Sequence, residues 1–144
     1  MAIRAIAGAA ARVNATVHII GAHLSDPPSN VEVYGELPFE STLPFIVHAD
    51  VGIAPYRSVD GAEYLAQSSL KIQQYSYCGL PILIERNIGV FGENIVHYDA
   101  NDNKSISKAV TAAIAMNKCR SYGRNVLGWD EVGDLLMRAI SSIS

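Results

Sequence analysis

Short apolar runs alternate with helical apolar stripes along this chain. The runs have the length and the Gly, Pro or polar boundaries of buried strands, and they cover residues 17–20, 31–34, 51–54, 82–84 and 95–98. Apolar residues at three- and four-residue spacing predict helices over residues 2–13, 105–118 and 129–143, and capping residues predict further helices over 41–49 and 69–78. Strands that alternate with helices are typical of a parallel sheet that is covered on both faces. We therefore predict an α/β fold with a parallel sheet and helices on both of its faces.

The loops that follow the predicted strands should meet at one edge of the sheet. Right-handed crossovers between parallel strands place the carboxyl ends of all strands on the same side. These loops carry Gly21, Glu36, Tyr56 and Glu85. The carboxylate of Glu36 can accept hydrogen bonds from sugar hydroxyls, and a plain surface carboxylate is the alternative. Tyr56 can lie against a base or ribose, or it can cover the edge of the core.

The helix predicted over residues 69–78 starts at a serine and stops at a Gly-Leu-Pro sequence. Ser68 or Ser69 can cap its free backbone N–H groups. Lys71 also lies in the first turn, where those groups and the helix dipole favour an anion. Gln74 lies three residues beyond Lys71, so its amide can share the same face of the helix. The pattern indicates a helix aimed at a phosphate, and an ordinary amphipathic helix with a solvated lysine is the alternative.

Composition narrows the class of protein. The 144 residues are 49% hydrophobic and 17% charged, which suits one domain with a sizeable core. The formal net charge is −3 and no Lys/Arg run occurs, so a nucleic-acid partner is not expected. No apolar run is long enough for membrane insertion, and no signal peptide is predicted. Two cysteines and four scattered histidines lack the spacing of metal ligands, so no metal site is predicted.

Several common nucleotide and hydrolase motifs are missing from the sequence. It contains no G-x-G-x-x-G, no G-x-x-x-x-G-K-[ST] and no G-x-S-x-G. These motifs place a phosphate against a glycine-rich turn or expose a nucleophilic serine. The absence of these motifs argues against dinucleotide oxidoreductases, P-loop enzymes and α/β-hydrolases, and no cofactor is predicted.

Three segments, taken in order, resemble the C-terminal, nucleotide-sugar-binding domain of a GT-B glycosyltransferase. They are V-E-V-Y-G-E-L-P at 31–38, A-D-V-G-I-A-P-Y at 49–56, and K-I-Q-Q-Y running to G-L-P over 71–81. Three shorter segments more closely resemble the glucuronosyltransferases of xanthan-type exopolysaccharide assembly, glycosyltransferase family 70. They are E-L-P-F at 36–39, P-Y-R-S at 55–58 and S-S-L-K at 68–71. The resemblance covers nearly all of the chain and implies a Rossmann-like sheet.

The resemblance implies a site for a UDP-sugar donor but no catalytic residue in this chain. The donor site would consist of Glu36, Leu37, Tyr56, Ser69, Leu70, Lys71 and Gln74. Ser69 and Lys71 would meet the diphosphate, through the helix N-terminus and a point charge. Glu36 and Leu37 would border the ribose and base, and Tyr56 would lie on the sugar or diphosphate side.

Gln74 stands where most retaining relatives have a Glu that bonds the ribose hydroxyls, and the glucuronosyltransferase group is expected to use Gln there. The resemblance thus implies an inverting, metal-independent enzyme that transfers glucuronate from UDP-glucuronate to a lipid-linked oligosaccharide. Such enzymes are cytoplasmic and peripheral to the inner membrane, and their catalytic base belongs to an N-terminal acceptor domain. A retaining enzyme with another NDP-sugar and a non-catalytic α/β interaction module are the alternatives.

The resemblance also implies that the domain lacks its first strand. In a doubly wound sheet that strand is central, between the strands predicted at 17–20 and 51–54. Without it, these strands must pair directly or leave backbone groups open, at a cost on the order of 1–3 kcal/mol per unsatisfied buried group. We therefore expect residues 1–144 to form a single nucleotide-sugar-binding domain, a fragment of a two-domain enzyme that is inactive alone.

Overall fold

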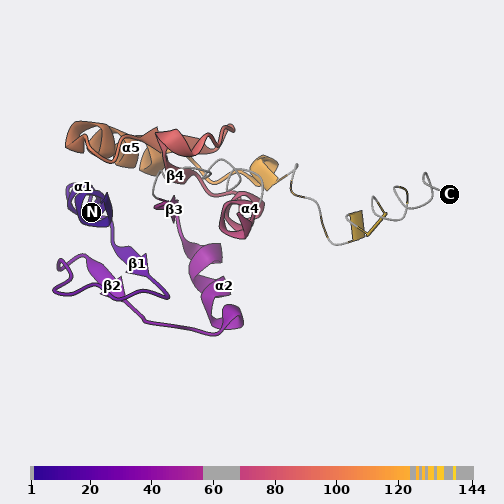
Figure 1. Ribbon diagram of the computed structural model, residues 1–144, viewed down its shortest axis with the longest axis horizontal. Helices are drawn as coiled ribbons and strands as arrows, with labels where there is room; N and C mark the ends of the chain where they lie inside the picture. The colour runs from indigo at the N-terminus through magenta and orange to yellow at the C-terminus, as the bar shows by residue number, and fades with distance from the viewer. Residues whose placement is uncertain are drawn as a thin grey trace.

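The computed structural model describes residues 2–56 and 69–123, with residues 126, 128, 130–131, 133–134 and 138 beyond them. Figure 1 shows the elements in chain order: α1 (Ala2–Ala11), β1 (Val17–Ile19), β2 (Val31–Val33), α2 (Phe39–His48), β3 (Gly52–Ala54), α4 (Leu70–Tyr77), β4 (Ile82–Glu85), the 3₁₀ turn η2 (Arg86–Ile88), β5 (Ile95–Tyr98), α5 (Asn103–Ala115) and the 3₁₀ turn η3 (Arg120–Gly123). All five predicted strands are confirmed, and so are the first four predicted helices. The helix predicted over 129–143 lies largely outside the described residues.

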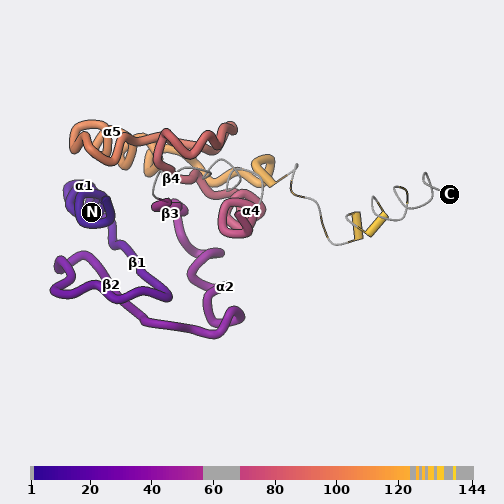
Figure 2. The backbone as a smooth tube through the Cα atoms, in the orientation of Figure 1, coloured from indigo at the N-terminus to yellow at the C-terminus, as the bar shows by residue number. Residues whose placement is uncertain are grey.

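Parallel pairing divides these strands into two sheets. β1 pairs with β2, and the second sheet has the order β3-β4-β5. Parallel strands are therefore confirmed, and of the two outcomes expected for a sheet without its first strand, β1 and β3 do not pair with each other among the described residues. The physical reason is the one anticipated from the strand order: a doubly wound sheet needs a central strand at this point. Figure 2 shows that the chain leaves the first sheet through α2 before it enters β3.

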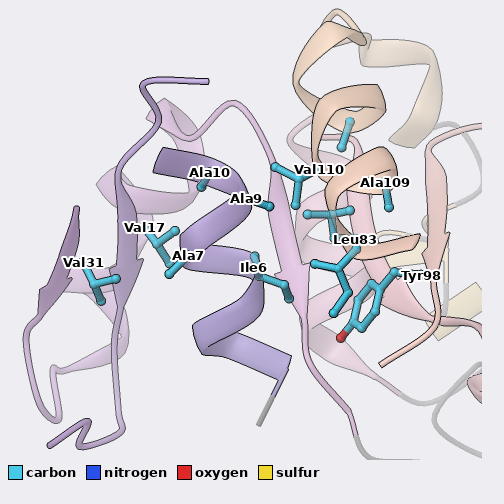
Figure 3. Close-up of a cluster of buried hydrophobic side chains, with 12 residues drawn as sticks. Ile6, Ala7, Ala9, Ala10, Val17, Val31, Leu83, Tyr98, Ala109 and Val110 are labelled. Carbon is cyan, nitrogen blue, oxygen red and sulfur yellow. The ribbon is translucent and has the colours of Figure 1, made fainter. Parts of the chain in front are cut away.

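One hydrophobic core joins both sheets through α1 and α5. Small side chains on α1 (Ala7, Ala9 and Ala10) allow the two helices to lie close together. Figure 3 shows Val17 of β1 on one side of α1 and Leu83 of β4 on the other. The helix pair thus holds the two sheets side by side although the strands β1 and β3 do not pair.

The second face of the three-stranded sheet is covered by α4. Side chains alternate along β4, so Leu83 enters the core with α1 and α5 while Ile82 and Ile84 enter a second core with Ile72 of α4. Each of these three β4 side chains is at most 2% exposed, and burying one contributes about 1.5–3 kcal/mol. Helices on both faces are therefore confirmed for β3, β4 and β5.

α2 begins at Phe39, two residues earlier than the predicted start at residue 41. Pro38 is the N-cap, and the hydroxyl of Thr42 donates to the carbonyl oxygen of Phe39 at 2.6 Å instead of capping the helix. Pro44 consequently lies inside the helix and not in its first turn, where its missing N–H would cost least. None of the helices in the described ranges is long and apolar enough to cross a bilayer.

Candidate functional site

The N-terminus of α4 is built as the sequence predicts. Ser69 is the N-cap, and its Oγ accepts a hydrogen bond from the backbone N–H of Ile72 at 3.4 Å. The Ser69 side chain is only 7% exposed, so this cap is part of the protein interior. A serine cap contributes typically about 1 kcal/mol to the stability of a helix. At the other end Gly79 has a φ of +74°, and a Cβ there would lie 2.8 Å from the carbonyl oxygen of Cys119.

Tyr56 connects the end of β3 to this first turn. Its hydroxyl forms a short hydrogen bond with Oγ of Ser69. The Nζ of Lys71 lies 5.7 Å from the centroid of the Tyr56 ring, within the range of a cation–π interaction. The structure therefore brings three of the seven predicted donor-site residues into one cluster, which we call the Tyr56 cluster: Tyr56, Ser69 and Lys71.

α4 reaches this position because a glycine faces it from β3. A Cβ on Gly52 would lie 2.3 Å from Cδ2 of Tyr75, so only glycine lets the Tyr75 ring lie against the strand. Burial of Tyr75 raises the pKa of its hydroxyl to about 12, with a smaller contribution from nearby Tyr56. The Tyr75 ring thus fixes the distance between α4 and β3, and with it the geometry of the Tyr56 cluster.

The other four residues predicted for the donor site are not part of the Tyr56 cluster. Gln74, half-buried and one turn along α4, lines the same cavity as Tyr56 and Lys71. Leu70 is 68% exposed, so its side chain points to solvent. Glu36, which is exposed, and Leu37, which is half-buried, follow β2 in the other sheet. The expected single sheet edge shared by Glu36 and α4 is therefore not formed, because the two sheets are not joined.

Two polar residues, Glu85 and Asn87, line the same cavity as Tyr56 and were not among the predicted site residues. Glu85, at the carboxyl end of β4, is only 5% exposed and lines the same cavity as Tyr56. Its carboxylate accepts hydrogen bonds from the backbone N–H of Asn87 at 3.2 Å and from the Asn87 side chain at 3.1 Å. The only signal for Glu85 in the sequence is its place directly after a strand. Its burial is decided by the packing of η2 on the sheet.

A cavity of about 1700 Å³ extends from the Tyr56 cluster into the space between the two sheets. Its polar end carries Tyr56, Lys71, Gln74 and Glu85, and the rest is lined mainly by apolar side chains of α1, β1 and β3. Small-molecule sites usually occupy about 300–1,000 Å³, so this cavity is larger than one ligand of that size requires. Within residues 2–56 and 69–123, no group of three or more His, Cys, Asp or Glu side chains is placed to hold a metal ion.

Comparison with known proteins identifies a relative among the glucuronosyltransferases. No protein-family model matches the chain. The UDP-glucuronate:glycolipid 2-beta-glucuronosyltransferase of Xanthomonas campestris pv. campestris is 34% identical over 125 residues, which is 85% of this chain. The aligned part is 31% of the relative, so the chain spans about a third of the length of the curated protein that it matches. The chain is thus a distant homologue of a UDP-glucuronate-dependent glucuronosyltransferase.

Proposed function

We propose that this chain is the donor-binding half of an inverting glucuronosyltransferase and that it binds UDP-glucuronate. The Tyr56 cluster at the N-terminus of α4 carries the proposal, because it gathers a lysine charge and a helix start where a diphosphate would bind. The homology supports UDP-glucuronate as the nucleotide sugar, since the relative is named for it.

Lys71 is the main electrostatic contact in this proposal. A diphosphate carries negative charge on several oxygens, and an ammonium group meets such oxygens as a point charge. The face of the Tyr56 ring keeps the ammonium over the start of α4. The Ser69 cap already occupies the backbone N–H of Ile72, so the N–H groups of Leu70 and Lys71 are the ones that face a bound phosphate.

The remaining donor contacts follow from position along α4 and β2. The neutral amide of Gln74 can donate to one ribose hydroxyl and accept from the next, whereas a glutamate there would only accept. Glu36 and Leu37 border the ribose and base, and Leu70 flanks the donor from the solvent side.

The reaction, the pathway and the location that we propose concern the longer enzyme of which this chain would be a part. We place the chain in a GT-B enzyme of exopolysaccharide synthesis that works at the cytoplasmic face of the inner membrane. The acceptor domain supplies the catalytic base, so residues 1–144 alone bind the donor weakly and do not turn it over. A retaining enzyme with another NDP-sugar remains the second candidate, and Gln74 in place of a glutamate argues against it.

Calorimetric titration of the chain with UDP and with UDP-glucuronate tests the proposal. Binding of both ligands is expected, and Lys71→Ala should weaken it by about tenfold or more, since a charge-assisted contact is lost. Lys108→Ala is the matched control, because Lys108 is an exposed lysine on α5, away from the cavity. A folded chain that binds neither ligand would favour the non-catalytic interaction module. Tighter binding of a UDP-sugar without a carboxylate would favour the second candidate.

A further inference from the structure

Glu85 is a buried carboxylate without a cationic partner. It is the last residue of β4 and is only 5% exposed. In the part of the chain that the structure describes, no lysine, arginine or histidine forms an ion pair with it. A carboxylate loses much of its hydration on burial, and proteins normally offset this cost with an opposite charge or with several hydrogen bonds. The burial of Glu85 therefore indicates a role beyond its place in the sheet.

The hydrogen bonds of Glu85 satisfy only part of its carboxylate. Its Oε2 accepts from the backbone N–H of Asn87 at 3.2 Å, and its Oε1 accepts from the Asn87 side chain at 3.1 Å. Tyr98 lies beside Glu85 in the register of β4 and β5, but its buried hydroxyl has no hydrogen-bond partner among the described residues. A carboxylate can accept about four hydrogen bonds. Each oxygen of Glu85 thus keeps a further acceptor position within the described structure.

The sheet places Glu85 near the Tyr56 cluster. The register pairs Ala54 of β3 with Ile84 of β4, so Tyr56 and Glu85 follow the same pair at one edge of the sheet. Both of them line the cavity that Lys71 of α4 also lines. Of the described residues along that cavity, Lys71 alone is a lysine or an arginine, so it marks the end at which a phosphate would bind. A group joined to this phosphate is then held close to the strand ends.

We infer that Glu85 is a specificity-determining residue of the donor site, where its carboxylate oxygens accept hydrogen bonds from ring hydroxyls of the transferred sugar. Because the diphosphate on Lys71 determines where the sugar lies, this role of Glu85 rests on the proposed function. Neighbouring hydroxyls of a sugar ring are donors that stand side by side, and the two oxygens of a carboxylate can accept from both. Asn87 is the positioning residue that orients this carboxylate.

Charge determines which side of the sugar Glu85 contacts. The carboxylate of glucuronate is negative, and two carboxylates at contact distance repel each other. Glu85 therefore contacts the hydroxyls of the ring and not its carboxylate. A buried acceptor that a ligand leaves unpaired weakens the binding of that ligand. Glu85 thus favours a donor whose sugar carries hydroxyls at this position.

Calorimetric titration of the 144-residue chain with UDP, UDP-glucuronate and UDP-xylose tests this role. UDP-xylose keeps the ring hydroxyls of glucuronate and lacks its carboxylate. Glu85→Gln should weaken the binding of both UDP-sugars by about tenfold and change the affinity for UDP by less than about twofold, because a charged acceptor becomes a neutral amide beside the sugar alone. Glu93→Gln is the matched control, since Glu93 is exposed and does not line the cavity.

The difference between UDP and the UDP-sugars separates a sugar contact from a purely structural role. The Gln amide keeps an oxygen for an N–H group of Asn87, so the urea midpoint of Glu85→Gln should stay near that of the parent chain. If Glu85→Gln does not fold, Asn87→Ala replaces it in the test. This variant removes one of the two bonds that orient the carboxylate and should weaken UDP-glucuronate binding by about threefold, with the affinity for UDP unchanged.

The other outcomes overturn the role of Glu85. Unchanged binding of both UDP-sugars, with UDP binding intact, would show that Glu85 only caps η2, and the proposed function would stand. Tighter binding of UDP-glucuronate with unchanged UDP-xylose would show that Glu85 faces the sugar carboxylate. An equal loss for UDP and the UDP-sugars would show that Glu85 supports the fold or the nucleotide. A parent chain that binds no UDP would overturn the proposed function, and the role of Glu85 with it.

Discussion

The hydroxyl of Tyr56 is hydrogen-bonded to Oγ of Ser69, which ties the end of β3 to the N-cap of α4. The same ring lies below the ammonium group of Lys71. One tyrosine therefore sets both the start of the helix and the position of the charge beside it. This relationship makes the donor site testable through stability as well as through binding.

Replacement of Tyr56 by Phe should separate the two roles of this residue. The ring remains under Lys71, but the buried Ser69 hydroxyl loses a hydrogen-bond partner, so we expect the free energy of unfolding to fall by about 0.5–1.5 kcal/mol. Urea denaturation measures this change. Tyr77→Phe is the control, because Tyr77 lies on the same helix but is 71% exposed. An equal loss in both variants would show that the Tyr56 hydroxyl does not stabilise the cap.

Replacement of Gly79 by Ala should destabilise the chain for two separable reasons. An alanine at a φ of +74° costs about 1–2 kcal/mol, and the new Cβ would also lie 2.8 Å from a backbone oxygen of Cys119. Gly89 provides a matched control, since its φ is +73° but nothing lies within 4 Å of a Cβ there. Thermal unfolding of both variants should show the larger loss for Gly79→Ala. Equal losses would mean that the contact with Cys119 does not matter.

The contact between Gly52 and Tyr75 predicts non-additive mutations. Gly52→Ala places a Cβ 2.3 Å from the Tyr75 ring, so the variant should lose on the order of 1–3 kcal/mol of stability through overpacking. In a Tyr75→Ala background the ring is gone, and the same substitution should cost much less. A double-mutant cycle of unfolding free energies measures the difference. Additive effects would contradict the packing described for α4 and β3.

Stability should fall at alkaline pH because of two tyrosines, the buried Tyr98 and the half-buried Tyr75. Burial raises the pKa of Tyr98 to about 12, with a smaller effect from Glu85, and burial likewise raises the pKa of Tyr75 to about 12. Both values lie above the ordinary pKa of 10, so the unfolded chain releases these protons first. The two protonated hydroxyls therefore contribute fully to the free energy of unfolding below pH 10. This contribution is lost as the pH rises through about 12, with a slope of about 1.4 kcal/mol per pH unit for each group.

Tyr98→Phe tests this pH dependence. The Tyr98 hydroxyl is buried and has no hydrogen-bond partner among the described residues, so its removal at pH 7 should leave stability unchanged or raise it slightly. Between pH 10 and 12 the variant should lose stability less steeply than the parent chain. Denaturant titrations at several pH values measure both effects. An unchanged alkaline slope would contradict the assignment to Tyr98.

The local features of this chain were predictable because neighbouring residues determine them. The Ser69 cap, the left-handed Gly79 and the short apolar strands each depend on residues within one or two turns. Lys71 and Gln74 could be assigned to the start of a helix for the same reason. Glu85 could not be recognised as a buried carboxylate, because its exposure depends on how η2 folds over the end of β4.

The sequence by itself determined the order of strands and helices, the capped helix at Ser69, and the resemblance that points to a nucleotide-sugar site. It also indicated that the strands at 17–20 and 51–54 lack a strand between them. Only the tertiary structure decided that they remain apart, that α1 and α5 hold the two sheets together, and that Glu36 does not join the Tyr56 cluster. The physical reason is that pairing between distant strands depends on the backbone partners available to both edges, which no local pattern of residues specifies.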